Sequence, residues 1–294
     1  MDSKNTPLVS VVMPSYNGSK FIHTALFSAL EQKYTNMECI VIDDGSTDNT
    51  KEIVASIQKQ DQRVKLVQNT TNQWIAKTLN KWLSVAQGKY IAILDQDDRW
   101  IDEYKTHKQV AFLEAYPKIS FVWTNGIIKN NKEGYYYSNL PQTDEQLKNS
   151  ILWQCPFMHS SIMYKKEIYD TIWGYPEDII YNSDHAYWLK AGENFKFANL
   201  PDYTLLYDTN AQNVCYAHYT AQTKEGLLLL LKYRGKYPNF VRWIKNIVFT
   251  TLSTYLSKHY PNTRKYIRKI CFKPEALSLD SQTDIFQTHQ SPTP

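Results

Sequence analysis

The sequence lacks the features of several protein classes. Its 294 residues include only four cysteines, none in a CxxC pair or at metal-ligand spacing, which argues against a disulfide-rich scaffold and a zinc site. The longest purely aliphatic run, residues 227–231, is far too short to span a bilayer. The first residues lack the basic and apolar regions of a signal peptide. We therefore expect a cytoplasmic protein with reduced thiols.

Glycine-rich phosphate loops are also missing. The chain contains neither GxGxxG nor GxxxxGK followed by Ser or Thr, the loops that cradle phosphates in dinucleotide-binding and P-loop proteins. This absence argues against a dehydrogenase and a P-loop kinase. Any phosphorylated ligand must then be held in another way.

The first hundred residues alternate between apolar strands and helices. Strands are predicted at 9–13, 39–42, 64–67 and 90–94, and helices at 21–30, about 46–59 and 75–86. Ser46 or Thr47 is predicted to cap the second helix. This order is typical of a doubly wound, mostly parallel α/β sheet, in which ligands bind beyond the carboxyl ends of the strands.

The pattern loosens after residue 100. We expect a helix at 102–115, a Tyr-rich loop or hairpin at 129–142, a helix from Ser183 to Leu189, and strands at 119–123, 160–164 and 195–206. The chain has 22 Tyr and 8 Trp. Such side chains line ligand grooves and also fill cores, and the sequence leaves both readings open.

Two acidic clusters follow predicted strands. Asp95, Asp97 and Asp98 come directly after one apolar run, and Asp43 and Asp44 follow another. Crowded carboxylates repel one another, so they suggest a bound divalent cation, a shared proton or a solvated turn. Two clusters at one sheet edge favour Mg²⁺ or Mn²⁺ with a phosphorylated ligand.

These segments resemble a known family. The stretch VSVVMPSYNGSKFIHTALFSALEQKYTNMECIVIDDGSTDNT, followed by GKYIAILDQDDRW, is similar to family 2 glycosyltransferases of the bacterial surface-polysaccharide type. The resemblance is dense over residues 8–100 and thinner to about 207. It implies a GT-A fold, which is Rossmann-like, with a mostly parallel sheet and flanking helices, over residues 1–215.

The resemblance also implies roles for individual residues. The nucleotide would be bound by Pro14, Tyr16, Asn17, Asp43, Asp44, Asn72, Asp95 and Gln96. Asp97, with Asp95, would hold Mn²⁺ or Mg²⁺ on the diphosphate, where the cation acts as a Lewis acid. Clustered carboxylates and metals also occur in nucleotidyltransferases, but the first predicted strand is followed by no basic phosphate loop.

A catalytic base is implied by the segment NSDHAYWLKAGENFKFANLP. Asp184 matches the family's base, although Ser183 stands where relatives carry an acid; a plainer reading is that Asp184 favours a helix N-terminus. Trp188 matches an acceptor-side aromatic residue. His159 could contact the acceptor or the phosphates, or be structural.

Other positions depart from the family pattern. Relatives usually have glycine where this chain has Trp74 and Trp82, and many carry Arg where it has Asp208. Trp74 could reshape the donor pocket, stack on the sugar or pack in the core. These departures support an alternative hypothesis, a catalytically degenerate scaffold that binds sugar nucleotides.

Basic residues are concentrated near the C-terminus. Residues 218–273 contain 12 Lys and Arg and one acid, Glu225. We predict a basic amphipathic helical extension over 216–273, followed by a disordered tail over 274–294. The extension could bind the inner face of the membrane peripherally or pack on the catalytic domain. With no nucleic-acid module visible, we expect no nucleic acid partner.

The combined expectation is a metal-dependent, inverting glycosyltransferase. It would move a sugar from a nucleotide-sugar donor, with UDP as the expected nucleotide, to a hydroxyl group of a glycan or lipid-linked acceptor in surface-polysaccharide synthesis. The sugar and the linkage depend on pocket shape, which the sequence does not reveal.

Overall fold

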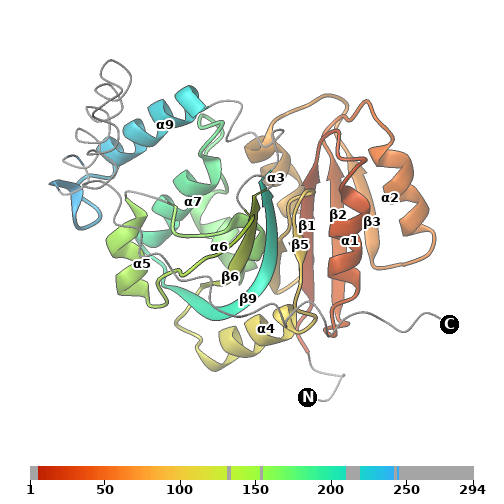
Figure 1. Cartoon of the computed structure of the whole chain (residues 1–294), viewed down its shortest axis with the longest axis horizontal. Helices are drawn as coiled ribbons and strands as arrows, with labels where there is room; N and C mark the ends of the chain where they lie inside the picture. The colour runs from red at the N-terminus through yellow and green to blue at the C-terminus, as the bar shows by residue number, and fades with distance from the viewer. Residues whose placement is uncertain (1–5, 131–133, 153–154, 210–218, 242–243, 245–294) are drawn as a thin grey trace. The chain divides into compact units, whose positions relative to one another are not determined.

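The computed structural model describes residues 6–130, 134–152, 155–209, 219–241 and 244 (Figure 1). Residues 1–240 form one compact unit. The predicted disordered tail and most of the predicted basic extension lie outside the described residues.

The first half of the sheet is parallel and confirms the four predicted strands. The strands are β1 (Val9–Ser15), β2 (Met37–Asp43), β3 (Val64–Gln68) and β4 (Tyr90–Ile93), arranged in the order β3-β2-β1-β4. Their residues are apolar because helices cover the faces of this part of the sheet. These helices are α1 (Ile22–Leu30), α2 (Thr50–Gln58) and α3 (Ile75–Leu83).

The predicted cap of α2 is wrong. The helix begins at Thr50 after Asn49, which makes no side-chain cap. The Ser46 hydroxyl instead accepts a hydrogen bond from the Asn17 N–H at 2.9 Å, and Asp48 accepts one from the Thr50 N–H at 3.0 Å. The predicted cap residues therefore belong to the loop contacts beyond β1.

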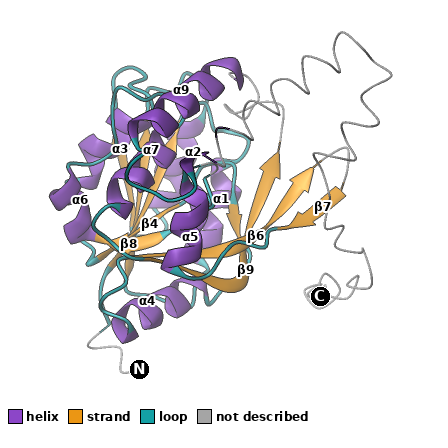
Figure 2. Cartoon of the chain, turned by 90° about the vertical axis from the view of Figure 1, so that its left-hand side faces the viewer, coloured by secondary structure: helices purple, strands orange, loops and turns teal. Residues whose placement is uncertain are grey.

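The second half extends the sheet with mixed pairing. Along the chain come β5 (Arg99–Trp100), α4 (Lys105–Ala115), β6 (Phe121–Asn130), β7 (Gly134–Tyr137), α5 (Asp144–Ile151), the short 3-10 helix η1 (His159–Ser161), β8 (Met163–Lys165), α6 (Lys166–Ile172), α7 (Ser183–Gly192), β9 (Phe197–Thr209) and α9 (Tyr219–Lys232). The strand order continues β4-β8-β6-β9-β5, with β7 on β6. Figure 2 shows β6, β9 and β7 side by side. The predicted hairpin is confirmed as β6–β7, and β9 is a single strand.

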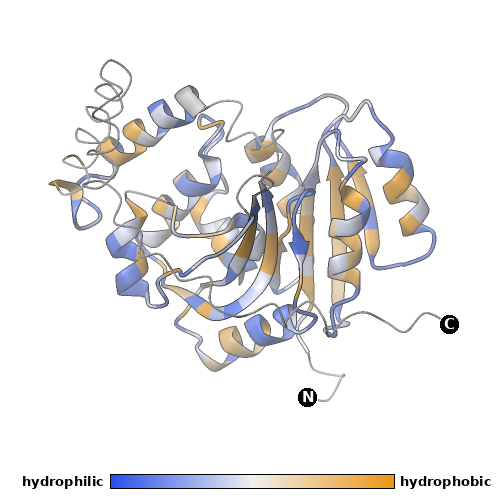
Figure 3. Cartoon of the chain, viewed as in Figure 1, coloured by the Kyte–Doolittle hydropathy of each residue, from blue (hydrophilic) through white to orange (hydrophobic). Residues whose placement is uncertain are grey.

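Buried apolar residues of the sheet and of the helices against it form the hydrophobic core. Figure 3 colours much of the parallel strands as hydrophobic. Much of the aromatic excess lies in one buried cluster between β6, α7 and β9, made of Phe121, Trp123, Phe157, Tyr164, Tyr175, Tyr187, Trp188 and Phe197. Trp123 stacks on Phe157 with ring centroids 3.8 Å apart. These aromatic residues are therefore core residues.

Helix α9 belongs to the compact unit. Its residues Leu229 and Leu230 are buried, and the nearby Tyr237 hydroxyl donates to the Leu189 carbonyl oxygen of α7 at 2.6 Å. The start of the predicted extension therefore packs on the rest of this unit, and residues 210–218 around the predicted boundary lie outside the described residues. None of the helices in the described part of the chain combines the length and apolar character that a bilayer crossing requires.

Candidate active site

The carboxyl ends of three neighbouring parallel strands meet at one edge of the sheet. Ser15 at the end of β1 lies opposite Asp43 at the end of β2, and the Asp44 N–H donates to the Ser15 carbonyl oxygen at 2.8 Å. On the other side of β1, the Leu94 N–H donates to the Val12 carbonyl oxygen at 3.1 Å. The three polar segments that the sequence places at strand ends therefore lie side by side, as predicted.

Gln96 joins the loop after β4 to the loop after β1. Its side-chain oxygen accepts from the Ser15 hydroxyl at 2.6 Å and the Tyr16 N–H at 3.0 Å, and its amide nitrogen donates to the Tyr16 carbonyl oxygen at 3.1 Å. Gly18 leaves room for this side chain, because a Cβ there would lie 2.0 Å from the Gln96 oxygen. Gln96 therefore braces the loops of the predicted nucleotide site.

Asn17 fastens the loop after β1 to the turn after β2. Its side-chain oxygen accepts from the Thr47 N–H at 2.9 Å, and its φ of 50° lies in the left-handed region that asparagine tolerates. The neighbouring Tyr16 is 43% exposed, whereas Pro14 is half-buried. The Tyr16 side chain is therefore more accessible to a ligand than Pro14 is.

The two acids after β2 are buried and hold backbone groups. An Asp43 oxygen accepts from the Ser46 N–H at 3.1 Å. An Asp44 oxygen accepts from the Gln73 N–H at 3.0 Å and from the Asn69 side-chain amide at 2.8 Å. These carboxylates fix the loops after β2 and β3, and the bonds use one oxygen of each acid.

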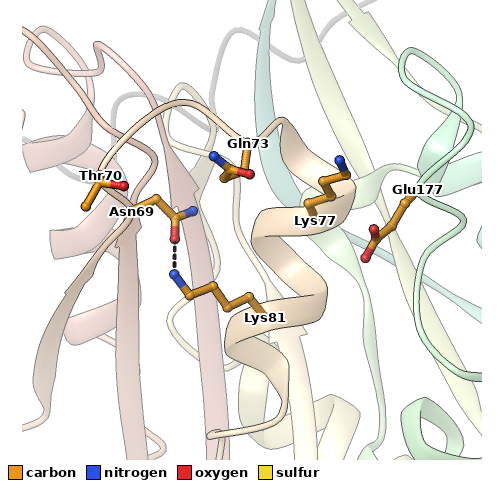
Figure 4. A pocket seen from close by; sticks show the side chains of 6 residues that line it. All are labelled: Asn69, Thr70, Gln73, Lys77, Lys81 and Glu177. Atoms are coloured by element: carbon orange, nitrogen blue, oxygen red, sulfur yellow. Dashed lines mark hydrogen bonds between the residues drawn. The ribbon is translucent and has the colours of Figure 1, made fainter.

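Asn69 connects Asp44 to a cavity of about 260 Å³ beside α3 (Figure 4). Its side-chain oxygen accepts from the Lys81 ammonium group at 2.7 Å and the Trp82 indole N–H at 3.3 Å. The cavity is lined by Asn69, Thr70, Gln73, Lys77, Lys81 and Glu177. Trp82 thus supports a buried amide beside the predicted nucleotide site.

Trp74 adopts a backbone conformation that favours glycine. It stands immediately before α3 with φ 67° and ψ 158°, and the predicted nucleotide residue Asn72, which is exposed, accepts its N–H at 2.9 Å. The Trp74 side chain is 48% exposed and meets Tyr181 edge to face, with centroids 6.2 Å apart. The core reading of Trp74 is therefore wrong, and its ring stands beside the loop that leads into α7.

The carboxylates after β4 meet the 3-10 helix η1. The His159 imidazole pairs with Asp95 at 3.1 Å, and the Ser160 hydroxyl contacts both Asp95 and Asp98. Burial raises the pKa of Asp95, but the adjacent His159 and Ser160 outweigh burial and hold it below its ordinary value. In turn, Asp95 overcomes the effect of burial on His159 and raises the imidazole pKa.

The surroundings of Asp97 raise its pKa, whereas those of Asp95 lower the pKa of that residue. Burial and the neighbouring charges of Asp95 and Asp208 raise its pKa to about 6. Burial followed by the Asp95 and Asp97 charges raises the pKa of Asp98 well above its ordinary value. Asp208 thus adds negative charge beside this turn and pairs with Lys129 at 2.9 Å.

These residues fit a cation that a ligand helps to hold. Among the described residues, no three His, Cys, Asp or Glu side chains form a group that could enclose a metal ion by themselves. Mg²⁺ is usually held by one or two carboxylates together with substrate phosphates. The mutual repulsion at Asp97 is consistent with such an open site, and so is a buried Asp98 oxygen that has no hydrogen-bond partner among the described residues.

Asp184 lies in the first turn of α7, as predicted. One of its oxygens accepts the His185 N–H at 2.7 Å, and its charge contributes to the raised pKa of His159. Helix α7 also reaches this pair, because the ring centroids of His159 and Trp188 lie 6.2 Å apart. Trp188, predicted on the acceptor side, is fully buried in the aromatic cluster.

Three residues of the site were not assigned a role from the sequence. Ser160 holds two carboxylates of the turn after β4, Asn69 holds Asp44, and Asp98 contributes a third acid. The run of acids and the His-Ser-Ser sequence point to Asp98 and Ser160. Nothing local distinguishes Asn69, whose partners come from other segments.

Residues 10–173 match the family described as Glycosyl transferase family 2, which is more than half of the chain. The chain belongs to this family. The resemblance seen in the sequence is thereby confirmed, as are the GT-A fold and the assignment as a glycosyltransferase.

Several similar proteins are named as glycosyltransferases. TuaG of Bacillus subtilis, named for teichuronic acid biosynthesis, is 36% identical over 50% of this chain and 59% of its own length. The Escherichia coli UDP-Glc:alpha-D-GlcNAc-diphosphoundecaprenol beta-1,3-glucosyltransferase WfgD is 39% identical over 42% of this chain and 47% of its own. The chain thus spans about half the length of these relatives. An uncharacterized glycosyltransferase of Haemophilus influenzae is 27% identical over 95% of this chain and 89% of its own length.

Solved glycosyltransferase structures share the fold. Residues 1–349 of S. aureus TarS in complex with UDP-GlcNAc align with a TM-score of 0.64 and 20% identity, covering 91% of this chain and 76% of that one. The Pyrobaculum calidifontis mannosyltransferase PcManGT in complex with GDP-Man and Mn²⁺ aligns with a TM-score of 0.61 and 22% identity, covering 81% and 67%.

Proposed function

We propose that this family 2 glycosyltransferase is metal-dependent and inverting, and that it takes its sugar from a UDP-sugar. The observation that carries the proposal is the acidic turn after β4, which His159 and Ser160 hold and in which Asp97 is half-buried. Burial and the charges of Asp95 and Asp208 raise the pKa of Asp97 to about 6. A divalent cation at this turn would relieve that repulsion and would also pair with the negative charge of a diphosphate. Similar proteins named for UDP-Glc and crystallised with UDP-GlcNAc support the choice of donor.

In this proposal the nucleotide lies across the loops after β1, β2 and β3. Tyr16 offers an exposed ring, Asp43 and Asp44 shape the turn that faces the base, and Asn72 is exposed in the adjoining loop. Gln96 keeps these loops in register with the acidic turn.

Asp95 and Asp97 would hold Mn²⁺ or Mg²⁺ against the donor diphosphate. A cation bound there supplies Lewis-acid stabilisation of the leaving diphosphate. His159 donates to Asp95 and so fixes the orientation of that carboxylate. Ser160 does the same for Asp98.

Asp184 would act as the general base. The acceptor hydroxyl transfers its proton to the Asp184 carboxylate while its oxygen attacks the anomeric carbon, and the bond from that carbon to the diphosphate oxygen breaks. A single displacement of this kind inverts the anomeric configuration. The relatives' names support a glycan or lipid-linked acceptor. The basic residues of 218–273 would support peripheral binding to the inner membrane face.

Calorimetric binding of UDP with and without Mn²⁺ tests the nucleotide and metal site. We expect wild type to bind UDP tightly only with Mn²⁺, and Asp97→Asn to lose that dependence. Glu114→Gln removes the same charge at the opposite end of β4, where Glu114 pairs with Lys89 at 2.6 Å, and should bind as wild type does. Binding that ignores Mn²⁺ would contradict the metal site.

Release of UDP from a panel of UDP-sugars tests catalysis. Wild type should cleave at least one UDP-sugar and so produce UDP. Asp184→Asn should bind UDP and Mn²⁺ as wild type does, but should produce UDP from the UDP-sugar at least about 100-fold more slowly. If both proteins bind UDP and both are inert across the panel, the degenerate scaffold replaces the enzyme hypothesis.

A further inference from the structure

Glu225, the one acid among the basic residues of 218–273, binds the loop that leads into α7. Its carboxylate accepts three consecutive backbone N–H groups: from Ile180 at 3.0 Å, Tyr181 at 2.9 Å and Asn182 at 3.0 Å. The Asn182 side-chain amide also donates to the Gln222 carbonyl oxygen at 2.7 Å. One turn of α9 therefore holds the whole entry to α7.

This contact replaces a cap that the helix does not provide itself. Asn182 is the N-cap residue of α7 but makes no side-chain cap hydrogen bond. A carboxylate that receives several backbone N–H groups forms charge-assisted hydrogen bonds, and its negative charge is favoured near a helix N-terminus. Glu225 thus fixes both the path of residues 180–182 and the start of the helix.

The loop of residues 180–182 lies next to Asp184 on one side and contacts Trp74, near the proposed nucleotide loops, on the other. Asp184 follows it by two residues, in the first turn of α7. On the other side, the Tyr181 ring meets Trp74, which ends the loop that Asp44 holds through Gln73. A shift of residues 180–182 would therefore move Asp184 relative to the donor loops.

We propose that Glu225 is a positioning residue that sets Asp184 for proton transfer, an inference that rests on the proposed role of Asp184 as base. Displacing a reacting group by about 1 Å can cost about 100-fold in rate. The hydrogen bonds that the Glu225 carboxylate accepts from described residues come from residues 180–182, so its loss should lower turnover without weakening the nucleotide site. The segment 218–232 would then contribute to catalysis through this contact, separately from any binding of its basic residues to a membrane.

The test compares Glu225→Ala and Glu225→Gln with a matched control in the full-length protein. Glu225→Gln keeps one acceptor oxygen. The control is Glu193→Gln, which removes a carboxylate that pairs with Lys236 at 2.7 Å at the other end of α7. The measurements are amide hydrogen exchange over residues 178–190, calorimetric binding of UDP with Mn²⁺, and UDP release from the UDP-sugar that wild type turns over.

For Glu225→Ala we expect faster exchange at residues 180–184, unchanged UDP binding, and kcat lowered about 10-fold to 100-fold with a smaller change in the donor KM. Glu225→Gln should lie between Glu225→Ala and wild type, and Glu193→Gln should match wild type. In an Asp184→Asn background, Glu225→Ala should lower the residual rate no further, because the two residues act through one step.

Different outcomes overturn the inference and the proposed function. Wild-type kcat in Glu225→Ala, alongside a defective Asp184→Asn, would overturn only the positioning role. A uniform rise in exchange with weaker UDP binding would also overturn it, by showing that Glu225 only stabilises the fold. Wild-type turnover by Asp184→Asn would overturn the base assignment, and the inference with it.

Discussion

Replacing Trp74 should reverse the usual order of stability between alanine and glycine. Trp74 has φ 67° and ψ 158°, a region that is essentially reserved for glycine and that costs another residue about 1–3 kcal/mol. Trp74→Ala keeps this strain, whereas Trp74→Gly relieves it. Both variants lose the ring and its contact with Tyr181, so their difference isolates the backbone.

The magnitude follows from opposing terms. Glycine gains the relieved strain but increases the entropy of the unfolded chain by about 0.4–1 kcal/mol relative to alanine. Trp74→Gly should therefore be more stable than Trp74→Ala by about 1 kcal/mol. The lost aromatic contact is worth about 0.5–1.5 kcal/mol, so Trp74→Gly should lie close to wild type and Trp74→Ala below it.

Urea denaturation, with thermal melting as a second measurement, decides the matter. A difference of about 1 kcal/mol corresponds to about 2–4 °C in Tm for a domain of this size. Tyr116 is a matched control, since it is 56% exposed with φ −122°, and there Ala should be more stable than Gly. If Trp74→Ala is as stable as Trp74→Gly, the strain argument is refuted.

Further predictions concern the loops and the pH dependence. Gly45→Ala should destabilise the fold by about 1–3 kcal/mol in denaturation, because φ is 76° and the new Cβ would lie 2.8 Å from the Thr71 backbone, whereas Gly134→Ala, with φ 94° and no atom within 4 Å, should cost less. Gln96→Ala should cost more free energy of UDP binding, measured by calorimetry, than free energy of unfolding, measured by denaturation, because it frees two loops. A larger loss in unfolding than in binding would contradict the role of Gln96 as a brace. Burial raises the pKa of Glu38, but its ion pair and hydrogen bonds outweigh burial and lower it. The stability that Glu38 contributes is therefore present above its unfolded pKa of about 4.3 and is lost as pH falls through the folded pKa. In denaturation experiments, the free energy of unfolding should fall less on acidification for Glu38→Gln than for wild type.

Local patterns in the sequence were sufficient for the first half of the sheet and for the acidic turns. The strands β1, β2 and β4 contain nearly continuous apolar runs because they are buried on both faces, and such runs can be recognised without knowing their partners. Asp43, Asp44, Asp95 and Asp97 directly follow those runs, and parallel strands bring their carboxyl ends to one edge. The first turn of α7 at Asp184 was also predicted from nearby residues.

Contacts between distant segments were decided only by the tertiary structure. Gln96 binds the loop after β1, 80 residues away in sequence, and Glu225 binds the entry to α7, 43–45 residues away. Ser46 was predicted as a cap, but Asn17 uses its hydroxyl. Trp188 has the pattern of an acceptor residue, yet the aromatic core encloses it. The local sequence indicates which kinds of contact a side chain can make. Which contact it actually makes depends on the distant segments that the fold brings beside it.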